Sequence, residues 1–341
     1  MMGEAGKGGR IVVGVEDSPG GRAALAYALR EARIRDARVE ALGAFSRPES
    51  WAGQAIPGWS MGPSVEEIRD RVQAHLDRIV SEIVDEMGPD ATGVTVSPHA
   101  VAGNAAAALL DSARNADLVV VGNRGRGGFA SMMLGSVSLQ CALHAPCAVT
   151  VVPASLDITP TAPPSDAQPS NVPPSDFIVV GVDGSPDSRA ALEYAVTEAR
   201  LRGARVKVVA AYSFPEYSAL GQPYPVLVTP EQIEADVVGA VREVVDEVLA
   251  GEEHPPAVTV SVHSGDAADV LTRSASDAVA LVVGHRGRGA VASTVLGSVG
   301  LRCVLHARCP VTIVGTERRR QRVHEPVAAT IPAIRAAIAT S

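Results

Sequence analysis

The chain has 341 residues, of which 46% are hydrophobic and only 3% aromatic, and its formal net charge is -8 at pH 7. This length predicts two globular domains, each able to bury a core of its own. The acidic balance and the scarcity of aromatic side chains argue against nucleic acid as a partner, because proteins that bind nucleic acid use basic patches and aromatic side chains that stack on bases.

The ends and the cysteine content bear on the cellular compartment. Residues 1–10 are glycine-rich and charged and do not resemble a signal peptide, and no run approaches the roughly 18 apolar residues of a membrane span. Four cysteines without an export signal fit a reducing interior better than a disulfide scaffold. We therefore expect a cytoplasmic protein that has no membrane partner.

One internal repeat covers nearly the whole chain. Residues 11–19 read IVVGVEDSP and residues 178–186 read IVVGVDGSP, so the copies begin with almost the same stretch. The repeat divides the chain into a first domain at 1–153 and a second domain at 177–315. Between them lies a proline-rich linker at 154–176, and a basic, alanine-rich tail follows at 316–341.

In the first copy, expected strands alternate with expected helices. The apolar run at 11–15 is typical of a parallel strand that is covered on both faces. Ser18 and Pro19 then predict the cap and the first residue of a helix. A second strand is expected near 39–45, and the next helix begins at Ser64, where Glu67 completes a capping box.

The remaining elements complete a five-stranded unit. We expect a strand at 94–100, a helix at 104–114, a strand at 118–121, a glycine segment with its helix, and a last strand at 148–152. The second copy repeats this order, and Thr229, Pro230 and Gln232 mark the start of its long helix. Such alternation predicts a doubly wound α/β sandwich, Rossmann-like or flavodoxin-like, with a parallel sheet in each of two tandem domains.

A glycine pattern follows the fourth strand of each copy. It reads GNRGRGG from Gly122 and GHRGRGA from Gly284, and nine residues after each Gly-x-x-Gly comes a Gly-Ser pair. Glycine lets the backbone approach a ligand, and a helix start adds partial positive charge. A sharp strand-to-helix connection would also need glycine, but two complete copies with arginines favour a polyphosphate site. The pattern is not a P-loop.

The spacing Gly-x2-Gly-x9-Gly-Ser, together with the stretch VGVDGS at 180–185, resembles the ATP-binding signature of the universal stress protein family. The resemblance is to the tandem form and covers about residues 10–153 and 177–315. It implies ATP as the ligand, with Mg²⁺, and a regulatory function. Two alternatives stay open, namely an interaction protein of the same fold that binds no nucleotide, and a slow ATP hydrolase.

The resemblance also implies a role for each matching residue. The carboxylate after the first strand contacts the nucleoside, the glycines lie against ribose and phosphates, and Gly-Ser-Val offers amides and a hydroxyl to the phosphates. In the second copy the expected site residues are Gly181, Asp183, Gly284, His285, Arg286, Gly287, Arg288, Gly289, Gly297, Ser298 and Val299. In the first copy they are Gly14, Glu16, Gly122, Asn123, Arg124, Gly125, Arg126, Gly127, Gly135, Ser136 and Val137.

The first copy departs from the family pattern at one position, because Glu16 stands where the second copy has Asp183. The longer side chain would have to fold back or displace the nucleoside. Its neighbour Asp17 points to the other side of an extended chain and is a poor substitute. We therefore expect the second site to bind ATP more tightly than the first.

A recurring group of cysteine and histidine raises the question of a metal site. It consists of Cys141, His144 and Cys147 in the first copy and of Cys303, His306 and Cys309 in the second. The spacing crosses from a helix into a strand without a second ligand pair, which favours buried small residues and no metal. Catalytic motifs are also missing, so we expect no dedicated enzyme.

The last strand of each copy, at 148–152 and 311–314, would be an exposed sheet edge. In the resembling family this strand supports dimerisation, which implies that the two halves pair edge to edge as a pseudo-dimer. A further homodimer and an unidentified regulatory protein partner stay open, and so does a contact made by the arginine cluster at 318–322 of the tail.

Overall fold

The computed structural model describes residues 8–46, 64–123, 125, 134–156, 176–213, 229–287 and 296–316. No helix within these residues is long and apolar enough to cross a membrane. Most of the linker, at 157–175, and most of the tail, at 317–341, lie outside them. So do five expected site residues, which are Arg124, Arg126, Gly127, Arg288 and Gly289.

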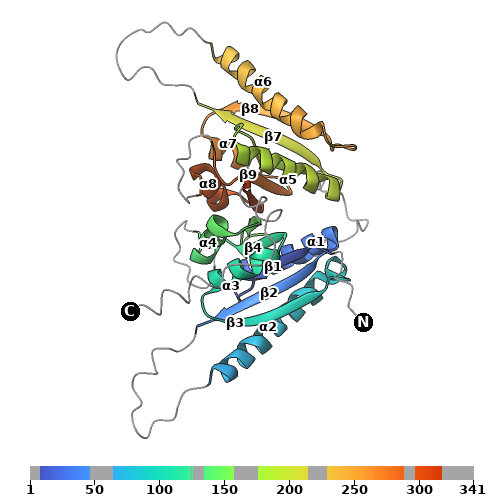
Figure 1. The fold of residues 1–341 in the computed structure, drawn as a ribbon, viewed down its shortest axis with the longest axis vertical. Helices are drawn as coiled ribbons and strands as arrows, with labels where there is room; N and C mark the ends of the chain where they lie inside the picture. Colours follow the sequence, from blue (N-terminus) through green and yellow to red (C-terminus); the bar gives the residue numbers. More distant parts are fainter. Residues whose placement is uncertain are drawn as a thin grey trace, which may run out of the picture.

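Strands and helices alternate in each half as expected (Figure 1). The first half contains β1 (Arg10–Gly14), α1 (Pro19–Arg35), β2 (Arg38–Phe45), α2 (Val65–Met87), η2 (Gly88–Ala91), β3 (Val96–Ala102), α3 (Ala105–Ser112), η3 (Ala113–Asn115), β4 (Leu118–Gly122), α4 (Ser136–His144) and β5 (Ala148–Val152). The second half contains β6 (Phe177–Gly181), α5 (Pro186–Arg202), β7 (Arg205–Tyr212), α6 (Pro230–Leu249), β8 (Val258–Ser264), α7 (Ala267–Ser274), β9 (Ala280–Gly284), α8 (Ser298–His306) and β10 (Val311–Val314).

Local sequence signals place the helix starts correctly. The Ser18 hydroxyl accepts a hydrogen bond from the Gly21 N–H at 3.1 Å, with Pro19 at the first helical position. Ser64 and Glu67 form the expected capping box at the start of α2, and Thr229 and Gln232 form the second one at the start of α6. These caps satisfy amides that have no partner within the helix.

Two expected boundaries are wrong by two residues. The third strand begins at Val96 and ends at Ala102, because it pairs with β2 from Val39 to Phe45, while the Val94 N–H bonds to the Ala91 carbonyl in the preceding turn. The helix expected at 104–114 ends at Ser112 and tightens into the 3-10 turn η3. Long-range strand pairing decides the first boundary, and a tightened last turn decides the second.

All ten strands form one sheet in the order β3-β2-β1-β4-β5-β10-β9-β6-β7-β8. The strands are parallel within each half, and β5 and β10 are antiparallel, with Thr150 opposite Thr312. The doubly wound fold is therefore confirmed, and the last strands pair edge to edge. This pairing covers an edge that each half would otherwise expose.

The helices cover the two faces of the sheet differently. On one face, residues of α3, α4, α7 and α8 pack with residues from both halves of the sheet in one continuous apolar core. On the other face, α1 and α2 cover one core, and α5 and α6 cover a second. The halves are thus joined by apolar packing on one face.

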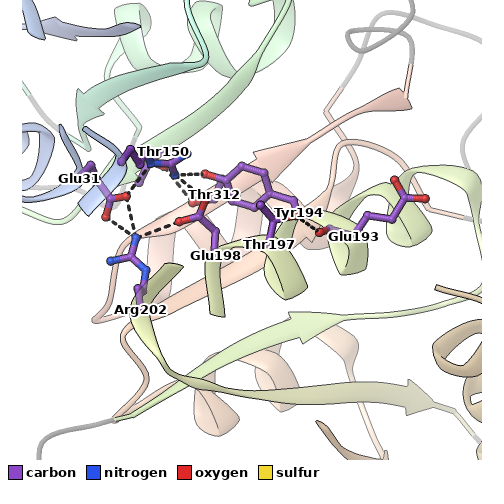
Figure 2. A network of polar contacts seen from close by, with 9 residues as sticks. Glu31, Thr150, Glu193, Tyr194, Thr197, Glu198, Arg202 and Thr312 are labelled. Atoms are coloured by element: carbon purple, nitrogen blue, oxygen red, sulfur yellow. Dashed lines mark hydrogen bonds and ion pairs between the residues drawn. The ribbon is translucent and has the colours of Figure 1, made fainter. Parts of the chain in front are cut away.

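Between α1 and α5, on the opposite face, the halves are joined by buried polar side chains (Figure 2). Arg202 of α5 donates to both carboxylate oxygens of Glu31 in α1, at 2.5 and 2.7 Å. In the reverse direction, Arg35 of α1 pairs with Glu198 of α5 at 2.6 Å and donates to the Tyr194 hydroxyl at 2.8 Å. Each helix thus gives the other a glutamate and an arginine, as expected of two copies related by a two-fold axis. We call this group of side chains between α1 and α5 the joint.

The same residue types supply this joint from both copies of the repeat. Tyr27, Glu31 and Arg35 match Tyr194, Glu198 and Arg202, each spaced four residues apart on one face of a helix. Below them, the Thr150 and Thr312 hydroxyls lie 2.9 Å apart across the β5–β10 pair. The residues predicted from the sequence did not include this set, although its recurrence in both copies is visible in the internal repeat.

Burial and charge act in opposite directions on the two glutamates. Burial raises the pKa of both carboxyls, because it penalises the charged form. For Glu31 the attraction of Arg202 and Arg35 is stronger, and its pKa lies below the usual value. For Glu198, burial and the nearby negative charge of Glu31 prevail, and its pKa is raised. Each glutamate contacts both arginines, because Arg35 also lies 3.2 Å from Glu31 and Arg202 lies 3.0 Å from Glu198. Loss of one arginine would therefore leave two buried carboxylates with a single positive partner.

The four cysteines are buried, as expected. Cys141, Cys147, Cys303 and Cys309 belong to the continuous apolar core, and all are free thiols. Burial raises the pKa of Cys141 and of Cys303 to about 12, and that of Cys309 to about 11. The described residues hold no group of three or more His, Cys, Asp or Glu that could bind a metal ion.

We expect Arg202→Met to lower the free energy of unfolding by about 3–5 kcal/mol, because the Glu31 carboxylate would stay buried but would lose two charged hydrogen bonds. Urea unfolding of the full chain measures this. The matched control is Arg205→Met, which removes an exposed arginine that pairs with Asp176 and should change stability little. Equal effects of the two substitutions would contradict a stabilising role of the joint.

We also expect the thiols of the native protein to react slowly with an aromatic disulfide reagent at pH 7.5. The reason is that the thiolate is the reactive form and burial disfavours it. After unfolding in denaturant, all four thiols should react within the mixing time. Fast reaction of the native protein would show that these cysteines are accessible.

Candidate functional site

The described part of each glycine segment follows the carboxyl end of β4 or β9, the strand next to the central strand of its half. In each half the chain builds the sheet outward from its first strand in both directions: β2 and β3 lie on one side of β1, and β4 and β5 on the other, and β6 lies in the same way between β7 and β9. The strand order therefore reverses at β1 and at β6. In open α/β sheets, ligands bind outside the carboxyl ends of the strands at such a switch point.

The first glycine of each segment lets a helix approach the sheet. A Cβ on Gly122 would lie 2.6 Å from the carbonyl of Gly20 in α1, and a Cβ on Gly284 would lie 2.8 Å from the carbonyl carbon of Asp187 in α5. Both distances are shorter than any side chain tolerates. Close packing of helix and strand therefore requires glycine at these positions, whatever the ligand.

Gly14 and Gly181, at the ends of β1 and β6, also face protein atoms. A Cβ on Gly14 would lie 3.1 Å from Leu109, and a Cβ on Gly181 would lie 3.0 Å from Leu271. These leucines belong to α3 and α7, which cover the sheet here. The packing of these two helices accounts for both glycines, and the expected approach of a ligand stays a prediction.

The second glycine of each segment faces the expected carboxylate. A Cβ on Gly287 would lie 2.7 Å from Oδ2 of Asp183, and a Cβ on Gly125 would lie 2.4 Å from Oε1 of Glu16. The structure thus brings together the carboxylate after the first strand and the glycine loop after the fourth strand. The two belong to segments about a hundred residues apart in the sequence.

Backbone hydrogen bonds join the start of each glycine segment to the Gly-Ser pair that ends it. The Gly135 N–H donates to the Asn123 carbonyl, and the Gly297 N–H donates to the His285 carbonyl, both at 3.0 Å. The Asn123 and His285 amides in turn donate to Val152 and Val314, the last residues of β5 and β10. The start of α4 or α8 is therefore held directly beside the glycine loop.

The helices that begin at the Gly-Ser pairs differ from the others. Within the described residues, six of the eight α-helices have a side chain that caps their first amides: Ser18, Ser64, Asn104, Ser185, Thr229 and Asp266. No described side chain caps helices α4 and α8, which begin after Gly135 and Gly297. An anion could take the place of such a cap at their first amides.

The residues after these glycines divide between surface and core. Ser136 and Ser298 are exposed at the first position of their helices. The side chains of Val137 and Val299 pack against the apolar core, so only their backbone can face a ligand. The Asn123 side chain is also engaged, because its Oδ1 accepts from the Ala154 N–H at 3.2 Å.

The two carboxylates are held in different ways. Asp183 Oδ1 accepts from the Ser185 N–H at 2.9 Å, across Gly184, whose φ of 80° favours glycine. Glu16 Oε1 instead accepts from the Ser18 hydroxyl at 3.1 Å, and the same oxygen faces Gly125. Whether the longer side chain folds back from a nucleoside or displaces it stays a prediction.

A further glycine lies against Glu16. A Cβ on Gly21 would meet the backbone carbonyl oxygen and the N–H nitrogen of Glu16 first, and its Cγ at 3.0 Å, and the second half has Ser188 at the corresponding position. Asp17 lies 3.7 Å from Arg22 and 3.5 Å from His75, on the side of α1 and α2. It turns away from the glycine loop, as expected.

Sequence analysis missed two side chains that hold the second loop. The Arg286 N–H donates to Oδ2 of Asp187 at 3.0 Å, and the Ser185 hydroxyl donates to the Arg286 carbonyl at 3.3 Å. Aligning the two copies could have drawn attention to Asp187, because the first half has Gly20 at that position. Nothing in the sequence indicated the partner of its carboxylate.

Comparison with known proteins agrees with the fold and with the repeat. The profile of the Universal stress protein family matches residues 8–153 and 176–315. A universal stress protein of Mycolicibacterium smegmatis is 31% identical over 310 residues, which cover 89% of this chain and 96% of that protein. One of Mycobacterium tuberculosis is 30% identical over 308 residues, covering 89% of this chain and 95% of that protein.

Solved structures show the same fold at lower identity. A universal stress protein from Archaeoglobus fulgidus has a TM-score of 0.58 at 18% identity, and the match covers 90% of this chain and 96% of the chain of that structure. A putative universal stress protein from Pseudomonas aeruginosa also has a TM-score of 0.58, at 16% identity, with 93% and 97% covered. The chain therefore belongs to the universal stress protein family and carries two family domains in tandem.

Proposed function

We propose that this protein is a cytoplasmic, nucleotide-dependent regulator of the stress response that binds ATP at the glycine loops of its two halves. The observation that carries the proposal is the pair of uncapped helices. Helices α4 and α8 begin at the Gly-Ser pairs, beside a glycine loop and a carboxylate, and in the described part of the chain no side chain caps them.

The phosphates would occupy the helix starts. Amides of the first turn and the partial positive charge of the helix favour an anion there. The exposed hydroxyl of Ser298 adds a donor at the first position of α8, and Ser136 does so for α4. This supports a polyphosphate more than a neutral ligand, because its several oxygens can share donors from the helix and from the loop.

The nucleoside would lie toward the first strand of each half. Asp183 is exposed and directed at Gly287, so its carboxylate is placed to accept hydrogen bonds from ribose hydroxyls. Mg²⁺ would enter with the phosphates, because it commonly binds through phosphate oxygens, water and one or two carboxylates. The chemistry that this arrangement supports is binding, and slow hydrolysis of ATP stays open.

The direct test begins with the protein as purified. Denaturing it and analysing the supernatant by mass spectrometry should reveal adenine nucleotide, and calorimetric titration of nucleotide-free protein should show ATP binding that phosphate-free adenosine does not match. If no nucleotide is released and ATP gives no heat or saturation, the proposal fails in favour of a nucleotide-independent interaction protein. Phosphate release in excess of protein would instead favour a hydrolase.

We expect Gly287→Ala to weaken ATP binding at the second site about tenfold or more, the equivalent of one lost hydrogen bond to a charged group. The new Cβ would lie 2.7 Å from Oδ2 of Asp183 and would displace that carboxylate from the loop. Stability should change little, because the displaced atom is the end of an exposed side chain. Calorimetric titration and thermal unfolding measure the two effects.

The matched control is Gly239→Ala, in the middle of α6, where a new Cβ would meet no atom within 4 Å. It should leave ATP affinity unchanged and raise stability by about 0.5–1 kcal/mol, because alanine favours helix more than glycine does. If both substitutions leave ATP binding intact, Asp183 and Gly287 do not form the nucleotide site.

A further inference from the structure

The first turn of α5 carries a carboxylate that the first half lacks. Oδ2 of Asp187 accepts from the Arg286 N–H at 3.0 Å, and Oδ1 accepts from the N–H and the hydroxyl of Thr316 at 2.9 and 2.7 Å. One side chain thus connects the start of α5 to the loop after β9 and to the segment after β10. The corresponding residue of α1 is Gly20.

A second side chain holds the next peptide group of the same loop. The Ser185 hydroxyl donates to the Arg286 carbonyl at 3.3 Å. In a trans peptide, the carbonyl of one residue and the N–H of the next point in opposite directions. Fixing the Arg286 carbonyl toward Ser185 therefore directs the Gly287 N–H away from α5. Two successive peptide groups of the loop are oriented from the β6–α5 side.

The first half has the same serine with a different partner, and it lacks the carboxylate. Its Ser18 hydroxyl donates to Oε1 of Glu16 at 3.1 Å, and Gly20 has no side chain with which to hold the loop. The two halves thus share the glycines of the loop but not the carboxylate of Asp187. This difference is separate from the length of the carboxylate at Glu16 and Asp183.

We propose that Asp187 is a positioning residue of the second nucleotide site, which holds the Gly284–Gly287 loop in the orientation that presents the Gly287 amide to the phosphates. The inference rests on the proposed ATP binding. It makes the second site the preorganised one. Binding then costs less, because the loop does not have to be ordered when the nucleotide arrives.

Electrostatics alone leads to the opposite expectation, which makes the inference testable. A carboxylate near the phosphate site repels an anion, so its removal would tighten ATP binding if charge were its only effect. If Asp187 instead orders the loop, its removal weakens binding. When the loop spends only about one tenth of its time in the competent orientation, the apparent Kd for ATP rises about tenfold.

The experiment compares the full chain with Asp187→Gly, which installs the residue of the first half, and with Asp187→Asn, which keeps the shape and one acceptor oxygen. Titration with ATP and with adenosine gives the Kd for each ligand, and hydrogen exchange reports on the Arg286 and Gly287 amides. Asp17→Gly serves as the control. Asp17 is also an aspartate near the start of a repeat helix, just before the Ser18 cap of α1, but its carboxylate contacts Arg22 and His75.

We expect Asp187→Gly to raise the Kd for ATP at the tighter site about tenfold, to change the Kd for adenosine much less, and to speed exchange of the two amides. Asp187→Asn should recover part of the loss, and Asp17→Gly should bind like the unchanged protein. An unchanged or lower Kd for ATP in Asp187→Gly overturns the inference. So does an equal loss for both ligands, which would indicate a structural role. If the unchanged protein binds no ATP, the proposed function itself fails.

Discussion

The arrangement of both sites depends on the close contact between a helix start and the end of a strand. Helices α1 and α5 pass so near to β4 and β9 that only glycine fits at 122 and 284. This contact brings the loop between the first strand and its helix within hydrogen-bond distance of the glycine loop. Asp183, Ser185 and Asp187 reach Gly287 and Arg286 for this reason. The first glycine of the motif builds the scaffold, and the second one makes room for the carboxylate.

The same two helices connect the sites to the joint between the halves. Each begins at a candidate site, after Ser18 or Ser185, and each contributes a glutamate and an arginine from its last two turns to the buried joint (Figure 2). Apolar packing joins the halves on one face of the ten-stranded sheet, and charged pairs join them on the other. Such pairs stabilise only when every partner is present, which favours one relative placement of the two halves.

Much of the fold was predictable, because its signals are local. The apolar runs at 11–15 and 118–121 predict buried parallel strands, and Ser64 with Glu67 predicts a helix start. The candidate site was predictable only in part. Glu31 and Arg202 are 171 residues apart and meet only because β5 pairs with β10, and Asp187 contacts residues 99 and 129 positions away. Such contacts depend on the assembled sheet, so neither helix periodicity nor the glycine motif indicates them.

We propose that this chain has two nucleotide sites built on one plan, with the second better preorganised. Native mass spectrometry of the full chain during a titration with ATP tests it most directly, because the method counts bound nucleotides. We expect the complex with one nucleotide to accumulate beyond the share that two equal sites would give, with a second nucleotide bound only at higher ATP concentration. A chain that fills both sites equally, or that stays free of nucleotide throughout the titration, would contradict this expectation.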